Sequence, residues 1–293
     1  MTTQEVAHNP DFGKISVDEM QMFFTSRGSL TGHTHMLTLE GDSQPSAVIS
    51  VVEDPVRAKF WTASAWLPSK KLADIVVNET MKLAHSLHPD WKFQPNVSVA
   101  DTDYISAYTS RGFVEIQRSL SMRIDFENPY PEPEIPYGFS WRIVSSPQDW
   151  KIFHQIHADA FEGHFGYVAR SLEDFSSFRT ESAAFDPHGI FILFDANNNP
   201  VAFVECTDEI AETNMTYINT VGVIHAHHKK GFGKLVMKRA FAYASSLGRM
   251  GVELYVDIAN TSGALRFYEG LGMRATSAIA CLDNPEWARD TSP

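Results

Sequence analysis

The first stretch of the sequence that could do chemistry is a short loop, His228-Lys229-Lys230-Gly231-Phe232-Gly233. An apolar, strand-like segment, residues 215–223, precedes the loop, and a helix-like run that begins at Lys234 follows it. The first turn of a helix carries N–H groups without intrahelical partners, and the helix dipole makes that end partly positive. Glycines let the backbone approach an anion closely, and lysines add charge. This arrangement is therefore predicted to hold a phosphate group.

The loop fits neither the P-loop nor the GxGxxG nucleotide motif. It resembles the pyrophosphate loop of the GNAT family of N-acetyltransferases, (Arg/Gln)-x-x-Gly-x-(Gly/Ala), with Gly231 and Gly233 matching and His228 in place of Arg or Gln. Residues 256–273 resemble the second signature of the family, a strand, an Asn and a helix that ends in Tyr-x-x-Leu-Gly-(Phe/Met). The two signatures occur in the order and with a spacing typical of the family, so the chain is identified as resembling it.

This resemblance implies that the chain binds acetyl-CoA. In the family, the backbone of a central strand pairs with the pantetheine arm where two strands splay apart, and loop amides cradle the pyrophosphate. The residues implied to bind the cofactor here are Val221, Gly222, Val223, His228, Lys229, Lys230, Gly231, Phe232, Gly233, Lys234 and Asn260. Without the second signature, the loop could equally be an ordinary strand-to-helix turn, and Asn260 could be a strand-end cap.

Tyr268 is the residue to which the resemblance assigns chemistry, because the family often uses the Tyr of this motif to protonate the departing thiolate of coenzyme A. A phenol close to the sulfur can donate a proton while the neutral amine attacks. The alternative is an aromatic core residue beside Phe267.

The general base is less clearly indicated. The family often places a carboxylate on a central strand, and that position falls near Tyr217. Glu205 is the candidate substitute, because a charged residue within an apolar strand run often marks a pocket. An outward-facing Glu205 is the alternative, and Glu253 and Asp257 are weaker candidates. An amine can also lose its proton to water, in which case no base is required.

The loop from Phe161 to Tyr167 carries three aromatic residues and His164. In the family, the segment at this place folds over the acceptor, so these rings could shape a substrate pocket. Packing of the same rings over the core is the alternative.

Strands and helices must position these residues, and periodicity predicts the same plan in both halves of the chain. The first half reads as helix 16–24, strands 35–39, 47–53 and 59–67, helix 68–88, strand 96–99, helix 104–111 and strand 114–124. The second half reads as strand 139–144, helices 147–161 and 171–183, strands 189–195, 200–206 and 215–223, helix 234–247, strand 252–258, helix 263–270 and strand 274–282.

The predicted fold class is therefore α/β (α+β), with two tandem acetyltransferase-like GNAT domains, each a mixed and mostly antiparallel sheet flanked by helices. Residues 1–126 form the first domain and residues 139–293 the catalytic one. Residues 127–138 contain four prolines and read as a stiff linker.

The two halves differ where chemistry is expected. Residues 107–113 resemble residues 267–273, which indicates a tandem duplication. At the place of the phosphate loop, however, the first half has residues 68–74, without a glycine, so we expect the first domain to be degenerate and non-catalytic. The tandem plan resembles that of the mycothiol synthases in architecture only, so it does not identify the acceptor.

Composition limits the other functions. The net charge of −12 argues against nucleic acid as a partner and is compatible with a cationic amine. Two cysteines offer neither a disulfide framework nor the spacing of a metal site, so no metal is expected. No apolar run reaches bilayer length and no secretory signal is visible, so the expected location is cytoplasmic, away from membranes.

The predicted function is transfer of an acetyl group from acetyl-CoA to the amine of a small molecule, with the active site in the second domain. The chain is expected to be a monomer with an internal pseudo-dimer, or a homodimer. The alternative is a non-catalytic acyl-CoA-binding sensor or partner protein. The phosphate loop would serve both functions, whereas only the enzyme needs Tyr268.

Overall fold

The computed structural model describes residues 32–38, 46–62, 65–66, 70–258 and 263–287. The expected helix 16–24 and Asn260 lie outside the described residues. Of the helices in these ranges, none combines the length and the apolar character needed to cross a bilayer.

The second half of the chain forms strands and helices close to the predicted ones. Its elements are β8 (Ser140–Ile143), α5 (Pro147–Phe161), α6 (Leu172–Thr180), β9 (Ile190–Phe194), β10 (Pro200–Thr207), η1 (Ala211–Thr213), β11 (Thr216–Val223), η2 (His225–His227), α7 (Phe232–Ser246), β12 (Gly251–Asp257), α8 (Ala264–Glu269) and β13 (Arg274–Asp283). Helix α5 begins where the sequence predicts, because Ser146 and Asp149 form a reciprocal capping box around Pro147.

The first half repeats much of this plan. Its elements are β1 (Gly32–Leu37), β2 (Ala47–Asp54), β3 (Lys59–Thr62), β4 (Ala65–Trp66), α3 (Lys70–Leu87), β5 (Lys92–Phe93), β6 (Asn96–Ser98), α4 (Thr102–Thr109) and β7 (Val114–Asp125). Residues 127–138 between the halves have no regular structure. They run along α7, where the Tyr130 amide donates to Ser245 Oγ at 2.9 Å and Glu132 pairs with Arg239.

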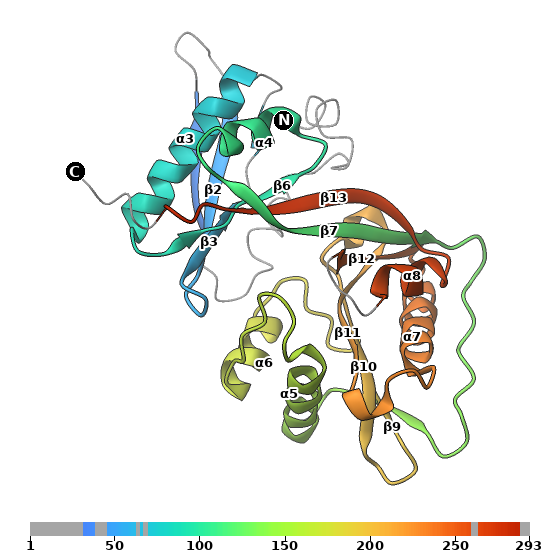
Figure 1. The fold of residues 1–293 in the computed structure, drawn as a ribbon. Helices are drawn as coiled ribbons and strands as arrows, with labels where there is room; N and C mark the ends of the chain where they lie inside the picture. The colour runs from blue at the N-terminus through green and yellow to red at the C-terminus, as the bar shows by residue number, and fades with distance from the viewer. Residues whose placement is uncertain (1–31, 39–45, 63–64, 67–69, 259–262, 288–293) are drawn as a thin grey trace.

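The final strands of the two halves are exchanged. The larger sheet has the order β6-β13-β7-β12-β11-β10-β9-β8, so β7 of the first half pairs with β12 of the second, and β13 pairs with β6 of the first. The long β7–β13 ribbon joins the two halves in Figure 1. Met122 of β7 is buried in the core of the second half, and Leu282 of β13 is buried in that of the first. The sequence repeat did not predict this exchange, and the division at residues 127–138 stays a prediction.

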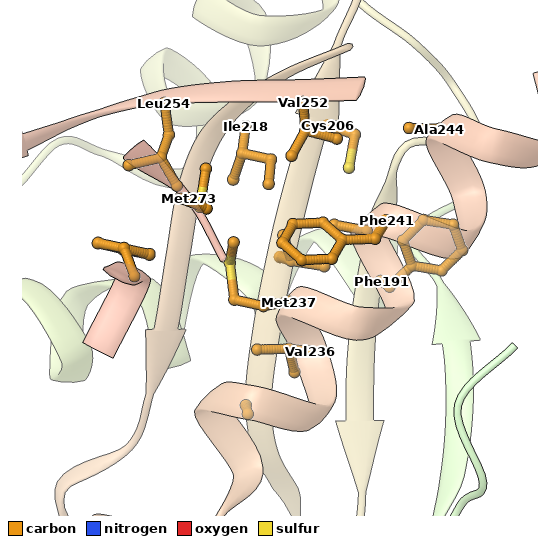
Figure 2. Close-up of a cluster of buried hydrophobic side chains, with 14 of the residues drawn as sticks. Phe191, Cys206, Ile218, Val236, Met237, Phe241, Ala244, Val252, Leu254 and Met273 are labelled. Carbon is orange, nitrogen blue, oxygen red and sulfur yellow. The ribbon is translucent and has the colours of Figure 1, made fainter. Parts of the chain in front are cut away.

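Helices cover both faces of the sheet in the second half. Helices α7 and α8 lie on one face and α5 and α6 on the other (Figure 1). Figure 2 shows Val236, Met237 and Phe241 of α7 packed against side chains from the sheet, such as Ile218 and Leu254. This core fixes where α7 begins relative to β11.

Strands β11 and β12 are parallel neighbours for only two residue pairs, Thr216 with Val252 and Tyr217 with Glu253. Beyond Tyr217 the two strands separate, and β11 continues alone on that side to Val223. In the first half, β3 and β5 likewise pair in parallel at only two positions, Lys59 with Lys92 and Phe60 with Phe93. Both halves therefore contain the same splay.

Candidate active site

At the beginning of α7, several backbone N–H groups donate no hydrogen bond to any described residue. These are the amides of Gly231, Phe232, Gly233 and Lys234, since the first helical bond runs from the Leu235 amide to the Gly231 carbonyl at 3.2 Å. Gly231 has φ of 87°, which favours glycine, and a Cβ there would meet nothing within 4 Å. The open space above these donors and the positive end of the helix suit an anion such as a pyrophosphate.

The His228 side chain is used to hold the loop itself. Its Nε2 lies 2.8 Å from the carbonyl oxygen of Val223, and because a carbonyl only accepts, Nε2 carries the proton and donates it. Lys230 is tied back in the same way, with Nζ donating to the Ala226 carbonyl at 2.9 Å. Lys229 and Lys234 are exposed beside them. The predicted loop residues therefore lie together, and the His228 side chain is hydrogen-bonded to the end of β11.

The edge of β11 next to this loop is open to a strand-like partner. Val221, Gly222 and Val223 pair with β10 on one side, and β12 has already separated on the other. Gly222 is required by packing, since a Cβ there would lie 2.5 Å from the Phe203 ring. This open edge leads directly to the amides of α7.

Tyr268 lies on α8 and is almost completely buried. Burial raises the pKa of its phenol to about 12, so the hydroxyl keeps its proton at neutral pH. The described residues give this hydroxyl no hydrogen-bond partner. The neighbouring Phe267 ring packs on Tyr268 at 5.1 Å and approaches the start of α7, where a Cβ on Gly233 would lie 3.3 Å from it. The Phe267 ring therefore lies between the predicted proton donor and the start of α7.

Glu205 is buried, but its carboxylate is fully engaged. Arg179 Nε donates to Oε1 at 3.0 Å, and Asn219 Nδ2 and Thr220 Oγ1 each donate to Oε2 at 3.0 Å. Both carboxylate oxygens are therefore occupied by neighbouring side chains, and neither is free to contact a substrate amine. These contacts favour a positioning role for Glu205 over the role of general base.

A cavity of about 210 Å³ lies beside this ion pair, and we call it the Glu205 cavity. Its walls come from both halves of the chain and include Trp61, Phe178, Arg179, Glu205, Tyr217 and Asn219. Thr207 also lines it, and the buried Thr207 Oγ1 has no hydrogen-bond partner among the described residues. The volume suits a small molecule, and the unpartnered hydroxyl suits a polar one.

Glu253 is the weaker candidate base, and it lies in the row of side chains that includes Tyr217. Ser121 Oγ donates to its Oε1 at 2.6 Å, and Thr276 Oγ1 lies 3.0 Å from Ser121 Oγ. None of the described residues occupies its second oxygen. Glu253 therefore keeps an oxygen that could contact a substrate, whereas both oxygens of Glu205 are occupied.

The loop after α5 was expected either to shape a substrate pocket or to pack over the core, and its side chains divide between inward and outward positions. The Phe161 ring stacks on the buried His157 at 4.6 Å, and Tyr167 packs beside the same imidazole at 6.0 Å. Phe165 and His164 are exposed. Part of the loop therefore caps the core, and part of it faces outward.

Two side chains at this site were not predicted, namely Arg179 and Trp61. Arg179 follows Phe175 by one helical turn, so a charged residue in the apolar stripe of α6 was the available signal. Trp61 gave no signal, because a strand pattern does not say which part of the fold will face it. Across the residues that the structure describes, no group of three or more His, Cys, Asp or Glu is arranged to hold a metal ion.

Comparison with known proteins places this geometry in context. Residues 150–273 match the family model described as the acetyltransferase (GNAT) family. A mycothiol acetyltransferase from Thermobispora bispora is 33% identical over 165 residues, or 55% of this chain and 55% of that protein. One from Salinispora tropica is 26% identical over 257 residues, or 87% of this chain and 78% of that protein. The first alignment thus spans about half the length of the relative.

Solved structures show the same fold. A GCN5-related N-acetyltransferase from Sphaerobacter thermophilus covers 95% of this chain and 89% of its own, with a TM-score of 0.77 at 16% identity. A tandem GNAT protein from the clavulanic acid biosynthesis pathway covers 90% of this chain and 86% of its own, with a TM-score of 0.70 at 11% identity. At these identities the likeness concerns the fold alone.

Proposed function

We propose that the chain, whose residues 150–273 match the GNAT acetyltransferase family model, transfers an acetyl group from acetyl-CoA to the amine of a small molecule. We place the active site in the second half of the chain, between the start of α7, the open edge of β11 and the Glu205 cavity. A cytoplasmic location is part of the same proposal.

One observation carries the proposal, namely that the unpaired amides of residues 231–234 lie at the end of the open edge of β11. A long ligand with an anionic group and an amide-bearing arm matches both features. The amides would take the pyrophosphate, and the backbone of Val221–Val223 would pair with the arm as an added strand would. When bound, acetyl-CoA supplies the thioester from which the acetyl group is transferred.

The side chains of this chain would then handle two protons. Tyr268 holds the proton that the departing thiolate needs, and its raised pKa keeps that proton in place until the thiolate forms. On the acceptor side, Glu253 is better able than Glu205 to take a proton from the amine, because one oxygen of Glu253 is not engaged by described residues. Glu205, fixed by Arg179, would hold the wall of the cavity.

Calorimetry with acetyl-CoA, followed by an assay of free thiol release over a panel of amines, tests this function. The panel includes the acceptor that mycothiol acetyltransferases use, because the curated relatives carry that name. We expect one acetyl-CoA site per chain and turnover with at least one small amine. Binding without turnover on any amine would support the sensor function, and two sites of similar affinity would contradict a degenerate first domain.

A further inference from the structure

The turn between β2 and β3 in the first half of the chain reaches across to the second half (Figure 1). Arg57 in this turn donates from Nε to the Gly166 carbonyl at 2.7 Å, in the connection between α5 and α6. Arg57 is itself fixed by Asp54, with 2.5 Å between Nη1 and Oδ2. The nominally non-catalytic half therefore holds a loop of the catalytic half.

Asp54 connects this contact to a second one. The Asp54 side chain is 3% exposed, and Arg170 Nη2, at the far end of the same loop, lies 3.9 Å from Oδ1. Burying a carboxylate without charge partners would be strongly unfavourable. Asp54 therefore needs both arginines near it, and its charge in turn fixes Arg57 and Arg170 beside each other. We call Asp54, Arg57 and Arg170 the interdomain latch.

The latch extends to the wall of the Glu205 cavity. The Arg170 guanidinium lies over the Phe178 ring, 4.8 Å from its centroid, and Phe178 lines the cavity next to Arg179. Trp61 lines the same cavity and lies on β3, directly after the turn that contains Arg57. One hairpin of the first half thus supplies one part of the cavity wall and, through Arg170, anchors another part.

The held loop has little else to fix it. Gly163 and Gly166 both have positive φ, 80° and 70°, and a Cβ on either would meet nothing within 4 Å. Besides two turns within the loop, described residues outside it hold it by the Arg57 hydrogen bond to Gly166, by His154 Nε2 at 2.9 Å from the Arg170 carbonyl, and by packing of Tyr167 beside His157. Without the latch, only the His154 contact and the Tyr167 packing would hold residues 163–170 from outside, so we expect this segment to open more readily.

We propose that the interdomain latch fixes the α5–α6 loop and, through Arg170 on Phe178, one part of the wall of the Glu205 cavity, so that the first half of the chain determines which acceptors fit. Asp54, Arg57 and Arg170 are then positioning residues, and Trp61 is a specificity-determining residue. This inference rests on the proposed function for its substrate, whereas the contacts themselves do not depend on it.

The test measures hydrogen exchange of residues 163–170 and steady-state kinetics in Arg57→Ala. Arg118→Ala is the matched control, because Arg118 makes an exposed ion pair with Glu115 on β7. We expect faster exchange in the loop of Arg57→Ala alone, with exchange in α7 unchanged. Loss of a hydrogen bond from a charged donor should raise the acceptor KM about tenfold while the acetyl-CoA Kd stays within about twofold.

A second variant guards against a simple folding defect. Trp61→Phe keeps a ring in the cavity wall, so the acceptor KM should stay near the wild-type value. Trp61→Ala removes the ring, so the acceptor KM should rise. Unchanged exchange in Arg57→Ala, or faster exchange with an unchanged acceptor KM, would overturn the proposal. If the unaltered protein bound no acetyl-CoA, the proposed function would fail, and the exchange result alone would decide whether the latch exists.

Discussion

Tyr108 and Tyr268 occupy corresponding places in the two halves, each on the short helix before the last strand, but their hydroxyls differ. Tyr108 is completely buried, lies 3.3 Å from the Tyr104 hydroxyl and makes a side-chain hydrogen bond with Thr62. The Tyr268 hydroxyl has no such partner among the described residues. A phenol committed to its neighbours cannot serve a ligand, so the duplicated tyrosine is structural in the first half and available in the second.

This difference gives a matched pair of variants. Tyr268→Phe removes only a hydroxyl that acts in the transition state, so it should lower kcat about 10²–10⁴-fold while acetyl-CoA affinity is kept. Tyr108→Phe should leave turnover unchanged and lower the free energy of unfolding by about 1 kcal/mol. Steady-state kinetics, calorimetry and denaturant titration measure the three quantities. Equal turnover in the wild type and Tyr268→Phe would assign protonation of the thiolate to water.

The phosphate loop can be tested at Gly231, whose φ of 87° is left-handed. Gly231→Asn should retain acetyl-CoA binding, because Asn tolerates this conformation and adds no charge. Gly231→Glu should abolish binding by placing a carboxylate where the anion is expected. Circular dichroism controls for folding, and calorimetry measures Kd. Equal affinities in the two variants would show that the pyrophosphate is not held here.

His228 stands where the family usually has Arg or Gln, and its ring donates to the Val223 carbonyl. His228→Gln keeps a donor, so acetyl-CoA affinity should be unchanged and equally independent of pH in both proteins. If the imidazole met the phosphates instead, protonation would tighten binding of the wild type as pH falls, and the Gln variant would lose that dependence. Calorimetry across the titration range of histidine separates the two cases.

The buried Glu205–Arg179 pair predicts a stability effect. Glu205→Gln leaves the Arg179 guanidinium buried without a charge partner, which should cost about 3–5 kcal/mol of unfolding free energy. Glu79→Gln breaks the exposed pair with Lys82 on α3 and should cost at most about 1 kcal/mol. Denaturant titration compares the two. Similar losses would mean that the interior accommodates the unpaired arginine with water.

His157 predicts the acid limit of stability. Its imidazole is buried among aromatic rings, and burial, followed by the charge of Arg179, lowers its pKa from 6.5 to about 3. Between pH 6.5 and about 3, His157 is protonated in the unfolded chain and neutral in the folded chain. The free energy of unfolding therefore falls as pH drops through this range. This group contributes a slope of at most about 1.4 kcal/mol per pH unit, which His157→Phe should remove. Identical pH slopes for the two proteins would contradict this assignment.

Local signals predicted much of the fold. The bounds of α5 follow from Ser146, Pro147 and Asp149, which act within one turn of each other. Contiguous motifs also indicated the phosphate loop and Tyr268, whose roles stay predictions. Contacts between distant segments were not predictable in this way. The partners of Glu205 on α6, and the reach of Arg57 to Gly166, depend on how the two halves meet, and no periodicity in either segment encodes that.

The ribbon formed by β7 and β13 also constrains how the chain can assemble. During synthesis β7 emerges with neither of its partners, because β12 and β13 are made later. Until then β7 is a strand with two free edges, which other chains can pair with. Two nascent copies could exchange β13 and satisfy the same ladder, giving a swapped dimer. Contacts of Tyr130 and Glu132 with α7 tether the connector to its own second half, and so favour closure within one chain.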